Sequence, residues 1–193
     1  MQTGKYMNKY RIPSARKKNW DYRSEAIYYV TICTQNRLFY FGNIKNGQMI
    51  LSDIGQFATT CWFDIPNHFP FIELINFVVM PNHIHGLLEI RDNDNFVGDT
   101  VETLHATSLR PFTEIHQRRK NDSMANISPK RGSLASVIRS YKSAVTRYAN
   151  KNNIDFGWQT RYHDHIIRNN SEFIRINNYI INNPENWRDD DLF

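Results

Sequence analysis

Residues 71–90 read FIELINFVVMPNHIHGLLEI, and this stretch decides the fold. It contains two runs rich in β-branched and other apolar residues, Phe71–Met80 and His83–Ile90, each with the length of a β-strand. Only Pro81 and Asn82 separate the runs, and a connection this short joins strands that run antiparallel. The stretch therefore predicts two antiparallel strands of one sheet.

Further strands are predicted on both sides of this pair. Ala26–Thr34 (AIYYVTICT) is β-branched and aromatic, which is typical of a strand. Leu38–Ile44 and Gln48–Leu51 flank Lys45-Asn46-Gly47, and Asn-Gly is a strong signal for a short hairpin. A last extended segment is expected at Trp158–Arg168.

Helices are expected where a capping residue precedes a segment with helical spacing. The three predicted helices run from Ser52 or Asp53 to about Asn67, from Ser133 to about Lys151, and from Ser171 to about Asn183. The order β, ββ, α, β, β, α, extended, α indicates the α+β class. We expect a ferredoxin-like or RRM-like antiparallel sheet with helices packed on one face.

The 193 residues, 40% apolar and 22% charged, are typical of one folded domain with its own core. We expect a basic N-terminal arm at 1–23, a single domain at 24–186 and an acidic tail at 187–193. Residues 92–132 lose periodicity, which predicts an inserted, mobile loop within that domain.

The composition also bears on where the protein acts. No stretch approaches the roughly 20 apolar residues of a membrane span, and residues 1–20 lack the apolar core of a signal peptide. Cys33 and Cys61 form no CxxC motif, which excludes a disulfide scaffold and a cysteine zinc site. We therefore expect a cytoplasmic protein.

Charge is distributed unevenly along the chain. Residues 1–23 carry seven basic residues against one acidic residue, and residues 110–147 carry nine against two. Between them, residues 24–109 carry three against nine, and residues 148–193 carry five against seven. Two basic blocks suggest a nucleic-acid partner, because Lys and Arg clusters gain affinity by releasing phosphate counterions. The alternative is a solvated tail and a solvated helix face.

The motif His83-Ile84-His85 could bind a metal ion. Residues i and i+2 of a strand point to the same face, roughly 6.5–7 Å apart along the chain, so both imidazoles could reach one divalent cation. A third ligand would have to come from elsewhere in the chain. The alternative is a strand with two histidines facing water.

Two C-terminal segments carry further candidates. On the last predicted helix, Tyr179 and Asn183 are four residues apart and share a face, so a phenol lies beside an amide oxygen. A structural tyrosine near a helix end is the alternative. Residues 158–168, WQTRYHDHIIR, contain a second His-x-His, His163 and His165, with arginines and aromatic side chains that could bind metal or nucleic acid.

Taken together, VVMPNHIHGLLE, WQTRYHDHIIR and YIINNP occur in this order with a helix between the first two. The chain thereby resembles the single-tyrosine HUH transposases, most closely the REP-associated tyrosine transposases, over about residues 24–91 and 133–186. It departs from short family members in its 92–132 insertion and in its acidic ending, Asp189-Asp190-Asp191.

The resemblance implies a set of roles for particular residues. His83, His85 and Asn183 would hold one Mg²⁺ or Mn²⁺ ion. Tyr179, on the C-terminal helix, would be the nucleophile that forms a 5′-phosphotyrosine and leaves a free 3′-OH. The implied activity is that of a single-stranded DNA endonuclease and strand transferase acting at hairpin-flanked, REP-like sites. Such a protein would be associated with the nucleoid, as a monomer or homodimer.

The DNA itself needs basic residues to hold it. Our candidates come from the arm, the second predicted helix and the extended segment: Arg16, Lys17, Lys18, Arg139, Lys142, Arg147, Arg161 and Arg168.

Two other functions remain open at this point. The chain could be an RRM-like nucleic-acid-binding protein, derived from such a transposase, whose catalytic apparatus is idle. It could also be a hydrolytic metalloenzyme that uses His83, His85, His163 and His165, although Tyr179 and Asn183 on one helical face favour the transposase chemistry.

Overall fold

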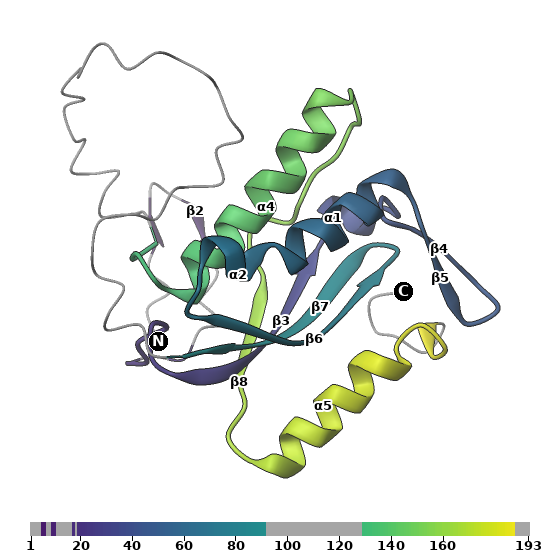
Figure 1. Ribbon diagram of the computed structural model, residues 1–193. Helices are drawn as coiled ribbons and strands as arrows, with labels where there is room; N and C mark the ends of the chain where they lie inside the picture. The colour runs from purple at the N-terminus through teal and green to yellow at the C-terminus, as the bar shows by residue number, and fades with distance from the viewer. Residues whose placement is uncertain (1–4, 7–8, 11–16, 18, 92–128, 188–193) are drawn as a thin grey trace, which may run out of the picture.

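The computed structural model describes residues 5–6, 9–10, 17, 19–91 and 129–187 of the chain. The predicted insertion lies outside the described residues up to position 128, as does the acidic tail from position 188 onwards. Within the described ranges, the centre of the fold is a four-stranded antiparallel sheet in the order β6-β7-β3-β8. Its strands are β6 (Ile72–Met80), β7 (His83–Ile90), β3 (Ala26–Cys33) and β8 (His163–Ile166), as Figure 1 shows.

Helices and two small strand pairs complete the described fold. The helical elements are η1 (Gln35–Arg37), α1 (Asp53–Phe63), α2 (Ile65–His68), α4 (Leu134–Lys151) and α5 (Asn170–Asn182). The paired short strands are β1 (Lys5–Tyr6) with β2 (Lys9–Tyr10), and β4 (Gly42–Lys45) with β5 (Gln48–Leu51). The expected α+β class, with an antiparallel sheet and helices packed against it, is confirmed. The helices do not all pack on one face as expected, because α5 lies on the face opposite α1 and α4.

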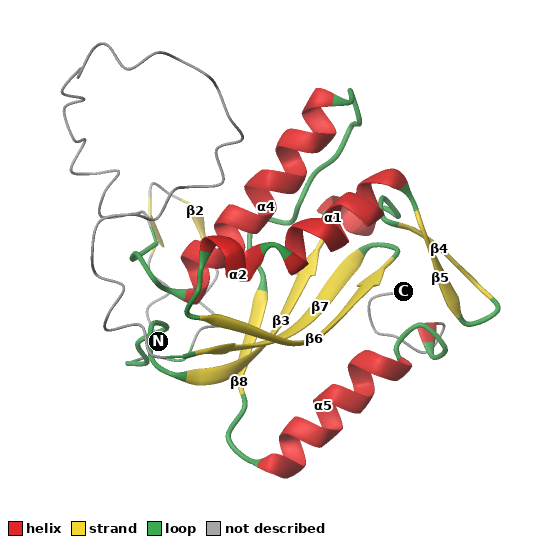
Figure 2. Cartoon of the chain, in the orientation of Figure 1, coloured by secondary structure: helices red, strands yellow, loops and turns green. Residues whose placement is uncertain are grey.

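The two faces of the sheet are covered by different helices. Tyr28, Val30 and Ile32 of β3 are fully buried in the large core beneath α1 and α4. The alternate residues Tyr29 and Thr31 face the other side, because successive side chains of a strand point in opposite directions. Figure 2 shows α5 lying against this second face, away from α1 and α4.

Local sequence signals explain where the elements begin and end. The Ser52 and Ser133 hydroxyls accept hydrogen bonds from backbone N–H groups of the first turns of α1 and α4, as their sequence predicts. The cap of α5 is Asn169 and not Ser171, since the Asn169 Oδ1 accepts from the Glu172 N–H. Asn46 and Gly47 both have positive φ, 52° and 73°, which is the geometry that an Asn-Gly hairpin turn requires.

Two predicted elements are shorter than expected. The strand expected to begin at Leu38 begins only at Gly42. The preceding residue, Phe41, is fully buried, and its backbone N–H donates to the carbonyl of Pro81 in the turn between β6 and β7. The helix expected to reach Asn67 ends at Phe63, and α2 follows as a separate short turn. Pro66 explains the break, because proline cannot donate the N–H bond that would continue the helix.

Gly86 allows α1 to pack directly on β7. A Cβ atom built at this position would come within 2.2 Å of the Trp62 ring, which is fully buried. Trp62 also stacks on Phe77 of β6, with ring centroids 4.7 Å apart. A glycine in the middle of β7 is therefore needed for the close approach of the indole to the strand that carries both histidines.

We predict that Gly86→Ala lowers the free energy of unfolding by about 1–3 kcal/mol, the usual cost of overpacking a core. Gly157→Ala is the matched control: its Cβ would meet the terminal oxygen of the Gln35 side chain, which can rotate away. Urea unfolding of both variants followed by circular dichroism measures the difference. Equal stabilities of the two variants would contradict this account of the Trp62 contact.

Candidate functional site

His83 and His85 meet on the face of the sheet that α5 covers. Both side chains are buried, 0% and 1% exposed, and their Nε2 atoms are 2.9 Å apart. The spacing on the strand correctly placed them on one face, and the alternative in which they face water is wrong. Two imidazole nitrogens that lie this close can contact one cation at the ~2.0–2.2 Å typical of metal–nitrogen bonds.

The outer nitrogen of each ring is held by a neighbouring side chain. His83 Nδ1 lies 2.7 Å from Asn82 Oδ1. Because an amide oxygen only accepts, Nδ1 carries the proton and donates it, and the lone pair of the neutral ring is on Nε2. His85 Nδ1 is hydrogen-bonded to the hydroxyls of Tyr29 at 2.7 Å and Thr31 at 2.9 Å. Such partners fix the orientation of metal-binding imidazoles.

Burial favours the neutral form of His83. Burial is the larger cause and the positive charge of Arg37 the smaller one, and together they lower the pKa of this imidazole to about 3. The neutral ring is the form that binds a metal ion, because ligation uses the nitrogen lone pair.

Tyr179 reaches the same site from α5. Its hydroxyl is 3.3 Å from His85 Nε2, and the two rings are 5.2 Å apart. The side chain is 42% exposed, so a large substrate can approach the phenol. Asn183, the next residue on this helical face, is buried at the end of α5.

Packing and hydrogen bonds place α5 against the sheet. Ile176 and Ile180 are buried with Leu87 of β7 in a small apolar cluster. The Asn76 amide of β6 donates to Asn177 Oδ1 at 2.7 Å, which ties the middle of the helix to the edge strand. Tyr179 directly precedes Ile180, so the packing of Ile180 on the sheet fixes the position of the phenol relative to the histidines.

The residue types are those that a divalent cation can use. His83 and His85 supply nitrogen and Asn183 can supply an amide oxygen, a mixed donor set that first-row divalent metals accept. The 2.9 Å approach of the two nitrogens and their fixed outer hydrogen bonds fit a metal ion. The ligand roles and the choice of Mg²⁺ or Mn²⁺ stay predictions.

The second histidine pair has other partners. His165 Nε2 is 2.7 Å from a Glu172 carboxylate oxygen, and the His163 ring lies at the edge of the Tyr29 ring. Among the described residues, no group of three or more His, Cys, Asp or Glu side chains could hold a metal ion. The geometry therefore gives no support to the four-histidine hydrolase.

A second feature, a groove on the α4 side of the sheet, gathers basic and aromatic side chains. It has a volume of about 1210 Å³ and lies between α4, residues 19–22 and the segment that leads into β8. The aromatic and basic residues that line it are Trp20, Tyr22, Lys130, Arg139, Lys142, Arg147, Trp158 and Tyr162. Tyr162, which directly precedes His163, thus lies at this groove.

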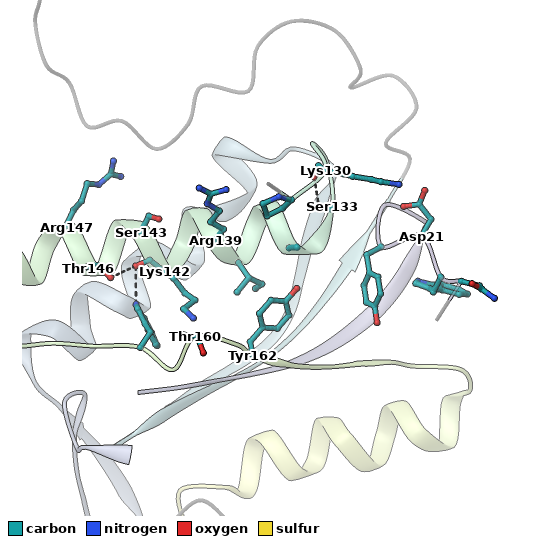
Figure 3. Close-up of a pocket in the computed structure, with 17 residues that line it drawn as sticks. Asp21, Lys130, Ser133, Arg139, Lys142, Ser143, Thr146, Arg147, Thr160 and Tyr162 are labelled. Carbon is teal, nitrogen blue, oxygen red and sulfur yellow. Dashed lines mark hydrogen bonds between the residues drawn. The ribbon is translucent and has the colours of Figure 1, made fainter. Parts of the chain in front are cut away.

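The three basic residues predicted on α4 differ in their surroundings. Figure 3 shows Arg139 and Arg147 projecting from the outer side of the helix, whereas Lys142 points towards the segment below it that carries Thr160. The Lys142 ammonium donates to the Gln159 carbonyl at 2.6 Å, and burial lowers its pKa to about 8. Lys142 thus forms part of the fold, and Arg139 and Arg147 offer the exposed charge.

The other predicted DNA contacts are spread over the surface. Lys17 is exposed, with its Nζ 4.6 Å from the centroid of the Trp20 ring, whereas Arg16 and Lys18 lie outside the described residues. Arg161 and Arg168 are exposed on either side of β8. These residues form no single cluster with the histidine site.

Sequence reasoning missed the residues that support the histidines. Tyr29 and Thr31 become neighbours of His85 only through the pairing of β3 with β7. Trp187, expected at the start of the acidic tail, is buried with its ring 5.8 Å from that of His83. Only Asn82 had a local signal, since it directly precedes His83 in the sequence.

Comparison with known proteins gives one close relative in sequence. The chain is 37% identical over 184 residues to an uncharacterized protein of Haemophilus influenzae, covering 93% of this chain and 92% of that protein. No family model matches the chain.

No helix in the described part of the chain has the length and apolar content needed to span a lipid bilayer.

Solved structures give the fold. A REP-associated tyrosine transposase bound to a REP hairpin aligns with 91% of this chain and 74% of its own, with a TM-score of 0.55 and 15% identity. A candidate transposase from Deinococcus radiodurans covers 86% of this chain and 97% of its own at 16% identity, but its TM-score of 0.37 is too low to support an argument. The expected resemblance to the REP-associated tyrosine transposases is confirmed in the fold.

Proposed function

Since this chain belongs to one family with the Haemophilus influenzae protein and has the fold of a REP-associated tyrosine transposase, we propose that it is a metal-dependent single-stranded DNA endonuclease and strand transferase. One observation carries the proposal: the Tyr179 hydroxyl lies 3.3 Å from His85 Nε2, which in turn lies 2.9 Å from His83 Nε2. A phenol and two imidazoles from elements far apart in the sequence thus lie together, which supports roles as nucleophile and cation-binding groups.

The reaction follows from what these groups can do. The Tyr179 oxygen forms a bond to phosphorus, the bond from phosphorus to the 3′ oxygen breaks, and the phenolic proton is balanced by the proton that the released 3′-OH carries. A divalent cation held by His83, His85 and Asn183 would neutralise phosphate charge. Because the phosphotyrosine conserves the phosphodiester bond, a 3′-OH can reverse the step and join strands without ATP.

The groove on the α4 side provides a surface for the rest of the DNA. Its arginines can neutralise phosphates, and its aromatic side chains can stack on unpaired bases. The related solved structure holds a REP hairpin, and we propose a hairpin-flanked single strand as the substrate of this chain. In this arrangement binding and cleavage use different surfaces, so they can be separated by mutation.

We predict that a single-stranded hairpin substrate with Mg²⁺ or Mn²⁺ yields a covalent protein–DNA adduct on Tyr179. Tyr179→Phe should abolish the adduct while retaining hairpin binding, and Tyr162→Phe is the control that should still form it. Denaturing gel electrophoresis detects the adduct, and peptide mass spectrometry locates it. An adduct on another tyrosine would refute the assignment, and binding without any adduct would favour the idle RRM-like protein.

His83→Ala should reduce cleavage by at least about 100-fold and change hairpin affinity by no more than a few fold, because the cation acts on the transition state more than on bound substrate. Cleavage is measured under single-turnover conditions with Mn²⁺, and circular dichroism checks that the variant folds. His68→Ala, which alters a histidine on α2 that pairs with Asp64, is the control. Full activity of His83→Ala would overturn the metal assignment.

Charge reversal at Arg139 and Arg147 together should weaken hairpin binding and flatten its salt dependence, because each lost phosphate contact reduces the slope of log affinity against log salt by about 1. Lys142 is left unchanged because its ammonium bonds within the fold. Lys45→Glu with Lys151→Glu makes the same change in net charge at exposed positions outside the groove. An equal effect of both pairs would show that only overall charge matters.

A further inference from the structure

The turn that follows β3 is hydrogen-bonded to Asn82, the residue whose side chain holds the His83 ring. Both the backbone N–H and the hydroxyl of Thr34 donate to the Asn82 carbonyl, each at 2.9 Å. Asn82 in turn accepts from the His83 ring through its side chain. The backbone from Thr34 to Leu38 is thereby fixed relative to the histidine pair.

The same turn is held from a second side and is strained. The Gln35 N–H donates to the Gly157 carbonyl at 2.7 Å, in the segment between α4 and β8. Asn36 and Arg37 both adopt left-handed backbone angles, with φ of 53° and 57°. This conformation is unfavourable for non-glycine residues, and such strain persists where surrounding contacts impose it.

Arg37 presents an exposed cation on this fixed turn. It lies between Thr34, which bonds to the residue before His83, and Phe39, whose ring contacts Trp187 beside His83. Arg23 and Arg91 form salt bridges with neighbouring carboxylates, but no described carboxylate lies within salt-bridge distance of Arg37. A guanidinium beside a cation-binding site is repelled by a metal ion, unless an anion lies between the two charges.

The surface next to the turn also suits a nucleotide. The Phe39 side chain is 51% exposed, and its ring lies 5.8 Å from that of Trp187, which packs beside His83. An exposed aromatic ring in this position can stack on an unpaired base. The surface beside the histidines thus has an aromatic ring, Phe39, that can stack on a base, close in the chain to a cation, Arg37, that can bind a phosphate.

We propose that Arg37 binds the phosphate that Tyr179 attacks, through paired N–H donors to its non-bridging oxygens. The inference rests on the proposed function for the identity of the substrate, and it adds a substrate-binding residue that is on neither α5 nor β7. The planar guanidinium matches two phosphate oxygens and stabilises the charge that develops on them as the tyrosine attacks. Hydrogen bonds to Asn82 and Gly157 fix the turn that carries Arg37 before DNA binds.

The first test compares the rate of adduct formation at saturating hairpin DNA with Mn²⁺. Arg37→Gln should slow the reaction by about 100-fold and change the dissociation constant of the hairpin less than about 3-fold. Arg37→Lys should fall in between, because an ammonium keeps the charge but cannot bind two oxygens in a plane. Arg91→Gln, at the opposite end of β7, is the control and should react at the wild-type rate. A rate for Arg37→Gln within two-fold of wild type would overturn the inference alone.

The second test does not depend on cleavage. Phenylglyoxal modifies accessible arginines, and mass spectrometry measures the modification of each one. In the Tyr179→Phe protein with Mn²⁺, a saturating oligonucleotide that spans the cleavage site should protect Arg37 at least about 10-fold and leave Arg91 reactive. Unchanged modification of Arg37 would overturn the inference. If the wild type forms no adduct, the proposed function fails by the first test, while protection still decides whether Arg37 binds DNA.

Discussion

Thr31 lies directly opposite His85 in the antiparallel pairing of β3 with β7, and this register fixes the chemistry of both faces of the sheet. On one face it buries Tyr28, Val30 and Ile32 under α1 and α4. On the other it brings the hydroxyls of Tyr29 and Thr31 to the outer nitrogen of His85. A shift of one residue would exchange the faces, so the apolar core that stabilises the domain also enforces the position of the polar site.

The site combines a buried side with an open side. The histidines are enclosed by the sheet, by the turn after β3 and by Trp187, and this enclosure keeps His83 neutral. Tyr179 enters from the exposed side, on a helix whose described apolar contact with the sheet is a small cluster around Ile176 and Ile180. The two histidines therefore belong to the sheet, whereas Tyr179 and Asn183 belong to a helix that docks separately on it.

The groove and the histidine pair lie on different sides of the sheet. The basic and aromatic groove is formed by α4 and by the segment that leads into β8, while the histidine pair faces α5. In the proposed function, a DNA strand bound in the groove would have to pass one edge of the β-sheet to reach Tyr179. The β8 edge is the nearer one, because residues 158–162 line the groove and β8 continues directly from them.

The sequence by itself determined the elements that depend on local signals. Apolar, β-branched runs of strand length predicted β6 and β7, and helical spacing with capping residues predicted α4 and most of α5. The spacing of His83 and His85 placed both rings on one face, because strand geometry repeats every two residues. Tyr179 was identified as the nucleophile candidate from its helical relation to Asn183 and from family resemblance. What only the tertiary structure decided were contacts between segments far apart in the chain: Tyr29 with His85, Trp187 with His83, and Thr34, on the turn that carries Arg37, with Asn82. Such contacts follow from strand register and helix docking, which depend on the packing of the whole core and leave no periodic trace in a local sequence.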